Sequence, residues 1–277
     1  MKFREPLNRD NMDVLRSYAP SVFAVHPSSK VSDKYRFIPT SEIVEALMDN
    51  GFACSSVVEN RVRKDDKRGY QTHLLKFRPN SVDALKVGDV FPEIRVKNSH
   101  DGLSALNIDA GLFRLACLNG MTVADSLIQK ISVRHSGKMV TDAIEASFRV
   151  LSDMPKAIEQ VKHWQSIELD PKEKLLLADA ALSLKYEADE EGKMIAPIAP
   201  VSLLHARRQG DQKADLWTTF NVIQENLIKG GQRGIVTDQY GYRKRASTRA
   251  VTSIDGDTKL NKALWSLAEK MASLKIA

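Results

Sequence analysis

The sequence predicts an α+β protein: an antiparallel β-meander with a packed N-terminal helix, followed by a mainly helical C-terminal half. Three observations support this fold class. Alternating stretches separated by glycine-bearing turns run from residue 52 to residue 120, apolar residues recur at helical spacing after Gly137, and helices do not alternate with strands as parallel crossovers require. We expect residues 1–136 to form the antiparallel-sheet region and residues 137–277 a helical region packed on it, either as two domains or as one continuous domain.

The first predicted elements are a short strand at 35–38, ended by Pro39, and a helix of about three turns after it. Thr40 is the expected N-cap of this helix, and Gly51 is a suitable left-handed stop. The next two strands are expected at 52–63 and 70–78, joined by a charged tip in which Gly69 supplies the turn geometry. These residues would form a long basic hairpin.

Residues 92–120 predict the centre of the sheet. Side chains alternate at 94–98 and at 103–107, and Asp101-Gly102 between them is a tight-turn signal, which together predict a β-hairpin. The apolar run 112–118 after Gly111 predicts a third, deeply buried strand. Arg114 is the exception in that run. Because a buried guanidinium without partners is costly, Arg114 should pair with a carboxylate or reach a groove that holds phosphate.

The C-terminal half contains several helix signals. Apolar residues from 140 to 151 predict a helix that Pro155 either kinks or separates from a second one. Asp170, Pro171 and Glu173 predict the start of a helix that runs to about residue 186. The next helix is expected to begin after Asp215 and to end at Gly230-Gly231.

The last helix is expected to begin at Asp257. Its apolar stripe consists of Leu260, Leu264, Leu267, Met271 and Leu274. This stripe and Trp265 need a cover, so we expect the protein to form a homo-oligomer.

The formal net charge of +6 is concentrated in two segments. Residues 61–78 contain seven Lys or Arg against two Asp, and residues 229–249 contain six against one. Such concentration predicts anionic partners, although two solvated basic loops would explain the same pattern. The candidate nucleic-acid-binding residues are Arg61, Arg63, Lys64, Lys67, Arg68, Lys76, Arg78, Arg114, Lys229, Arg233, Tyr240, Tyr242, Arg243, Lys244, Arg245 and Arg249.

The sequence marks no catalytic, metal or cofactor site. His100 and Asp101 are adjacent in a turn, where side chains usually diverge, and neither Ser99 nor Cys117 has the setting of an activated nucleophile. The histidines are scattered and the two cysteines form no CxxC pair. The glycine-rich stretch 229–234 follows a helix, whereas a phosphate-binding loop opens one. We therefore expect no catalytic residues, no metal and no cofactor.

Composition also bears on the location of the protein. No apolar run approaches the roughly 18 residues of a membrane span, and the N-terminal residues lack the apolar core of a signal peptide. Two cysteines are too few for a disulfide framework. These features predict a cytoplasmic protein with no membrane partner.

Several strings of the sequence resemble a known family. These are YRFIPT, GFACSSVVENRVR, PEIRVKNSHDGLSALNIDAGLFRLACLNG, DLWTTFNVIQENLIKGG and TRAVTSIDGDTKLNKALWSLAE. Over nearly the whole chain the sequence is similar to the YfjQ/YafZ family of prophage-associated proteins, which lies within a broader phage and plasmid domain family of undefined function. The resemblance implies a phage, prophage or other mobile element as the setting, and it supplies no catalytic residues.

The leading functional hypothesis is a non-enzymatic nucleic-acid-binding protein of a mobile element that holds single-stranded DNA in recombination or replication. Tyr240 and Tyr242 lie among cations up to Arg249, a composition suited to stacking bases while contacting phosphates. Residues 240–249 lack an apolar period, and their charge is expected to leave them mobile without a ligand. The alternative is a protein-interaction inhibitor or regulator of host defence or replication, with a host protein as partner.

Overall fold

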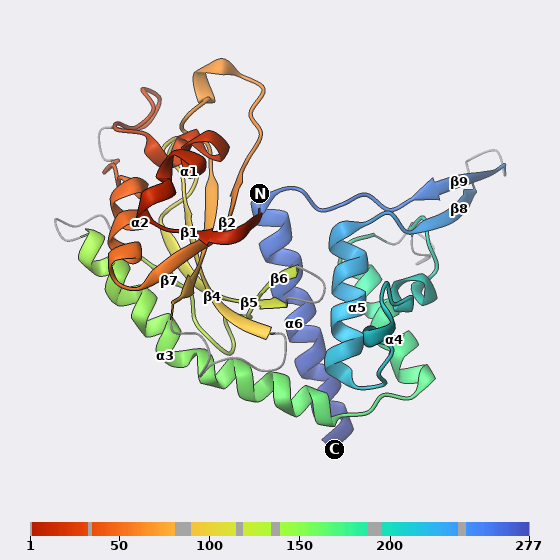
Figure 1. Cartoon of the computed structure of the whole chain (residues 1–277). Helices are drawn as coiled ribbons and strands as arrows, with labels where there is room; N and C mark the ends of the chain where they lie inside the picture. Colours follow the sequence, from red (N-terminus) through yellow and green to blue (C-terminus); the bar gives the residue numbers. More distant parts are fainter. Residues whose placement is uncertain are drawn as a thin grey trace. The chain divides into compact units, whose positions relative to one another are not determined.

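The computed structural model describes residues 2–32, 35–80, 90–114, 119–133, 139–187, 195–237 and 242–276. The chain forms two compact units, Met1–Ala157 and Ile158–Ala277, which are the red-to-green and green-to-blue parts of Figure 1. Helix α3 (Met139–Ser166) belongs to the end of the first unit and the beginning of the second. The domain boundary expected at residue 136 stays a prediction.

The first unit is built on one antiparallel sheet, which confirms the predicted fold class. Six strands are neighbours in chain order and a seventh, β7, pairs with β5. The strands are β1 (Lys2–Leu7), β2 (Phe52–Glu59), β3 (His73–Pro79), β4 (Val90–Asn98), β5 (Asn107–Arg114), β6 (Asn119–Thr122) and β7 (Ile131–Ser132). Every pairing is antiparallel.

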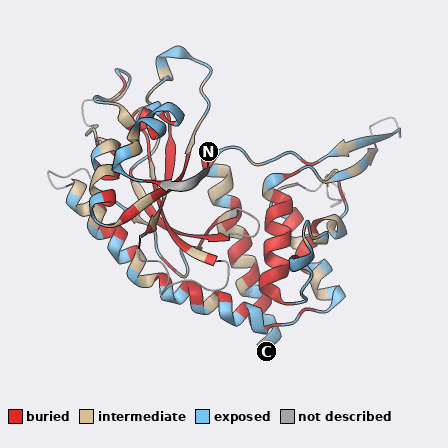
Figure 2. Ribbon diagram, in the orientation of Figure 1, coloured by how far each residue is buried: buried red, intermediate tan, exposed pale blue. Residues whose placement is uncertain are grey.

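One face of the sheet carries the core of this unit. Alternate residues of the central strands, such as Phe77, Ile94 and Ile108, are fully buried. Helices α1 (Met12–Tyr18) and α2 (Thr40–Asp49) pack on β2, and α2 buries an apolar face of Ile43, Val44, Leu47 and Met48. The core strands are red in Figure 2.

Two predictions for the N-terminal region are wrong. Residues 35–38 form no strand, and the edge of the sheet comes instead from β1. Thr40 is not the N-cap of α2 either. Pro39 occupies that position, and the Thr40 side chain is buried among polar groups distant in sequence. Gly51 does end the helix as predicted, with φ of 84°.

The centre of the sheet differs from the predicted hairpin. Residues 103–106 are not in a strand, and β5 runs without a break through Gly111. The alternation at 103–107 is misleading because residues 103–106 belong to a loop whose turn is held locally, with Asp101 Oδ1 accepting a hydrogen bond from Leu103 N. The turn itself is confirmed by Gly102, whose φ is 78°. Of the run 112–118, residues 115–118 lie outside the described residues.

The basic hairpin has shorter strands than predicted. Strand β2 ends at Glu59 and β3 begins at His73, so residues 60–72 form a long loop with a 3-10 turn at Asp65–Lys67. Gly69 has a φ of 87°, and its N–H donates to Oε1 of Gln71. The turn geometry predicted for Gly69 is thus confirmed, although the loop around it is longer than expected.

The second unit surrounds one buried helix. Its helices are the C-terminal part of α3, then α4 (Pro171–Ser183), α5 (Leu216–Lys229) and α6 (Ile254–Ile276). Every residue of α5 from Leu216 to Leu227 is buried, and Figure 2 shows this helix red along most of its length. Trp164 packs against Trp265 with ring centroids 4.7 Å apart, and Trp217 and Phe220 complete an aromatic cluster.

Local signals placed most helix ends correctly. Asp170 and Glu173 form a reciprocal capping box, and Asp215 accepts a hydrogen bond from Thr218 N. Gly230 ends α5 with φ of 63°. Helix α3 is continuous through Pro155, and α6 begins three residues earlier than predicted, where Ser253 Oγ accepts from Gly256 N.

The apolar stripe of α6 is largely covered within one chain. Leu260, Leu264, Trp265 and Met271 are buried, whereas Leu274 is 71% exposed. The stripe therefore gives no reason for self-association through this helix.

Candidate functional site

The segment after α5 forms a two-stranded antiparallel ribbon of β8 (Arg233–Thr237) and β9 (Arg243–Ser247). Within the segment 240–249, which has no apolar period, Arg243–Ser247 thus form a strand, and the expected mobility of the segment stays a prediction. Arg233 lies opposite Ser247, and Ile235 lies opposite Arg245. Residues directly opposite one another share a face, and faces alternate along each strand, so Arg233, Arg243 and Arg245 lie on the same face of the ribbon.

This arginine face is open to solvent. Arg233, Arg243 and Arg245 are all exposed, and Ile235 between them is 54% exposed. The opposite face is partly covered by backbone, because a Cβ at Gly234 would collide with the carbonyl oxygen of Pro197. The face that contains Gly234 is thus covered in part by the backbone at Pro197, whereas the face with three arginines can bind a ligand.

Hydrogen bonds fix the base of the ribbon to α5. Gly231 N donates to Thr248 O at 2.8 Å, and Thr248 N donates to Gln232 O at 2.9 Å. Gln232 Nε2 donates to Asn226 Oδ1 on α5, and the Nδ2 of Asn226 binds the carbonyl of Leu203. The arginine face is therefore held on a buried helix.

The remaining predicted residues near the ribbon have different environments. Tyr242 is 69% exposed just before β9, Lys244 is exposed, and Arg249 is exposed after the ribbon. Lys229 pairs with Glu225 at 2.6 Å at the end of α5. Tyr240 lies outside the described residues.

The first basic segment divides into two parts. Arg61, Arg63, Lys64 and Arg68 are exposed in the loop 60–72, and Lys67 is half-buried there. Arg68 pairs with Asp65 at 3.2 Å, and Asp66 pairs with Lys30. Lys76 and Arg78 instead belong to β3 within the sheet.

The second face of the sheet carries a buried charge cluster that the sequence did not reveal. Glu93, which is 1% exposed, accepts hydrogen bonds from Ser55 Oγ at 2.9 Å and from Arg78 Nε at 3.0 Å. The Arg78 guanidinium also lies 3.8 Å from the ring centroid of Phe113. The Arg78 guanidinium is thus engaged in contacts within the protein, so it is not available to bind a phosphate group.

Arg114, at the end of β5, is 9% exposed. Its backbone is paired with Val90 and Asn119. The anionic partner expected for its side chain stays a prediction.

His100 belongs to a sealed polar network centred on Thr40. Its Nε2 lies 3.3 Å from Thr40 Oγ1, and His73 Nε2 lies 3.0 Å from the same oxygen, which also accepts from Asn98 Nδ2. Both histidines have no exposed surface. Burial lowers the pKa of His73 to about 3 and that of His100 to about 4, so both imidazoles are neutral near pH 7. Asp101 turns instead toward Leu103 N.

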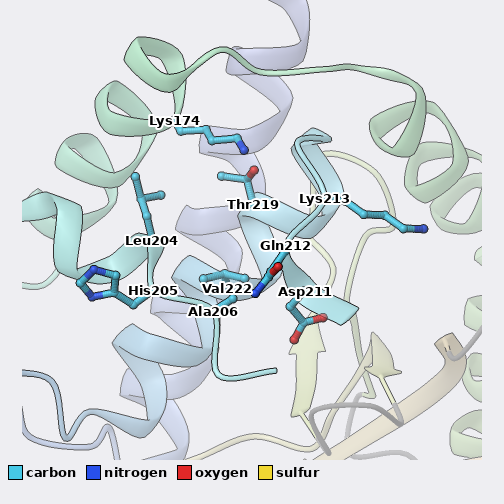
Figure 3. Close-up of a pocket in the computed structure, with 9 residues that line it drawn as sticks. All are labelled: Lys174, Leu204, His205, Ala206, Asp211, Gln212, Lys213, Thr219 and Val222. Carbon is cyan, nitrogen blue, oxygen red and sulfur yellow. The ribbon is translucent and has the colours of Figure 1, made fainter. Parts of the chain in front are cut away.

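A polar pocket of about 320 Å³ lies beside α5 (Figure 3). In Figure 3 Lys174 points toward Thr219, whereas the ends of His205 and Lys213 point away from one another. Asp211 in its wall is bound to Arg208 at 2.7 Å, and Arg208 also forms a bidentate pair with Glu225. Asp211 is thus held by a residue outside the pocket, and the lining side chains do not converge as a nucleophile and base would.

The described residues contain neither a metal-binding cluster nor a membrane-spanning helix. No cluster of three or more His, Cys, Asp or Glu side chains there could hold a metal ion. No described helix is both long and apolar enough to cross a membrane. Burial raises the pKa of the Cys54 thiol to about 12, so this cysteine is unreactive, and Cys117 lies outside the described residues.

The fold and surface define an α+β protein whose second unit carries an exposed cationic β-ribbon. The chain belongs to the family described as "Domain of unknown function (DUF932)", which matches residues 27–265. It is 36% identical over 266 residues to each of two Escherichia coli K12 proteins, UPF0380 protein YafZ and UPF0380 protein YfjQ. Each alignment covers 96% of this chain and 92% of the relative. No solved structure matches the chain.

Proposed function

We propose that this protein binds nucleic acid without catalysing a reaction on it, and that the β8–β9 ribbon makes the principal contact. The observation that carries the proposal is the arginine face, on which Arg233, Arg243 and Arg245 are exposed together. Guanidinium groups match phosphate geometry bidentately, and neutralising phosphates releases counterions. The opposite face is partly covered at Gly234, so the ribbon has one preferred binding side.

Single-stranded DNA is the favoured ligand. Tyr242 is 69% exposed beside Arg243, so its ring can stack on an unpaired base while the arginines contact the backbone. A two-stranded ribbon also fits the major groove of duplex DNA, so the two ligands must be compared directly. The exposed cations of the loop 60–72 offer a second phosphate contact. A role in recombination or replication of a prophage or other mobile element is part of this proposal.

A second candidate is an inhibitor or regulator that binds an acidic host protein. It is favoured by Ile235, which is 54% exposed in the middle of the arginine face and would add apolar contact in a protein interface. A pull-down from nuclease-treated host lysate tests this candidate, because a stoichiometric acidic protein that survives nuclease treatment would favour it.

Fluorescence anisotropy with labelled single-stranded and duplex DNA of equal length tests the main proposal. We expect tighter binding to the single strand and an affinity that falls steeply as salt rises. Absence of binding to either DNA at low salt would overturn the proposal.

A further inference from the structure

Helix α4 carries a small apolar surface on its solvent side. Leu175 is 45% exposed and Leu176 is 61% exposed, and Val201 of the neighbouring 3-10 helix Pro200–Leu204 is 49% exposed. These side chains line one groove of about 530 Å³ between α4 and that 3-10 helix. Exposed clusters of large apolar side chains are typical of interaction surfaces.

Two opposite charges of α4, Lys172 and Asp179, lie at equal distances along the helix on either side of this apolar surface. Lys172 lies three residues before Leu175, and Asp179 lies three residues after Leu176, on the same exposed stripe of the helix. The inward face consists of Leu177, Ala178, Ala181 and Leu182, which are buried in the unit. The stripe therefore reads cation, two leucines, anion from one end to the other.

This order is self-complementary. When two such helices pack antiparallel about a two-fold axis between Leu175 and Leu176, Lys172 of each copy faces Asp179 of the other. Each Leu175 then faces Leu176 of the other copy. A two-fold interface requires that a surface match itself in this way, whereas a different protein would need no such symmetry. We propose that the α4 surface, with the groove beside it, binds a second copy of this chain.

The surface is small compared with stable interfaces, so the dimer should be weak and dependent on concentration. Sedimentation equilibrium of the full chain, up to its solubility limit, should show a monomer–dimer equilibrium. Leu176→Glu places one charge from each copy in the interface and should raise the dissociation constant of the dimer about a hundredfold. Leu103→Glu, at a leucine that is 72% exposed in the first unit, is the matched control and should leave it unchanged.

Charge reversal gives the sharper test. Lys172→Glu alone and Asp179→Lys alone each create two like-charge contacts in the symmetric dimer, so each should weaken it about tenfold. An equimolar mixture of these two variants should form a heterodimer, because both contacts between unlike chains are then attractive. Equal melting temperatures would show that both variants are folded.

Three results would overturn the proposal. They are a wild-type monomer at every concentration, a dimer insensitive to Leu176→Glu, or no gain in dimer when the two charge variants are mixed. Because none of these residues lies on the β8–β9 ribbon, DNA binding and dimerisation can fail independently.

Discussion

The side chain of Arg95 on β4 crosses β5 at Gly111. A Cβ at position 111 would lie 2.9 Å from Cδ and 3.1 Å from Cγ of Arg95. By passing there, the guanidinium reaches Thr122 on β6 while it remains 3.4 Å from Asp109 on β5. Arg95 is 2% exposed, so its long stem has little room to move aside.

Gly111→Ala should therefore destabilise the protein by about 1–3 kcal/mol, the usual cost of an overpacked core. Urea unfolding measures this free energy. Gly210→Ala is the matched control, because nothing lies within 4 Å of a Cβ there and its φ is not positive. Equal stability of Gly111→Ala and the wild type would contradict the close approach.

The buried histidines predict acid sensitivity. Their folded pKa values, about 3 for His73 and about 4 for His100, lie below the unfolded value of 6.5. The unfolded chain therefore binds more protons, so stability is full above pH 6.5 and is lost as pH falls toward 4. The slope approaches about 1.4 kcal/mol per pH unit for each histidine.

Urea unfolding between pH 7 and pH 5 measures this slope. His100→Gln should reduce the slope by the contribution of about one proton, which is about 1.4 kcal/mol per pH unit. A wild-type stability that is constant over this range would exclude two neutral buried imidazoles.

Arg208 should be a strong determinant of stability in the second unit. It pairs with Asp211 and Glu225, whose side chains are each 3% exposed. Arg208→Ala would leave buried carboxylates with fewer partners, although Lys229 still reaches Glu225, and should cost about 3–5 kcal/mol. Lys156→Ala, which breaks an exposed pair with Asp153, should cost about 0–1 kcal/mol. Similar unfolding midpoints for both variants would contradict this assignment.

The ribbon predicts a face-specific effect on DNA binding. Arg243→Ala combined with Arg245→Ala removes two cations from the arginine face and should flatten the salt dependence on single-stranded DNA by about 1.4 in slope. Lys244→Ala combined with Arg249→Ala removes the same charge from positions outside that face, and should weaken binding less. Anisotropy titrations at several salt concentrations measure both slopes.

Melting temperatures should stay nearly unchanged in these two double variants, because the altered side chains are exposed. Equal losses of affinity would mean that only total charge matters. Unchanged affinity in both would direct attention to the loop 60–72.

The fold class and most helix ends can be predicted from the sequence. Strands, helices and helix caps depend on residue patterns that span only a few positions. The cap at Asp170 is an example, because its side chain accepts hydrogen bonds from the backbone N–H groups of Lys172 and Glu173. The cations of the ribbon were also visible in the sequence. Their common face was not, because it depends on the register of β8 against β9.

The role of each ambiguous residue depends on its tertiary contacts. Thr40 is a residue type common at helix N-caps, but its side chain lies among His73, His100 and Asn98. Gly111 is a residue type common in turns, but it lies inside a strand, where it makes room for Arg95. The apolar stripe of α6 suggested an interface, but most of it, including Leu260, Leu264 and Met271, is buried in its own chain. Each of these outcomes depends on contacts between residues far apart in sequence, and local propensity carries no information about those contacts.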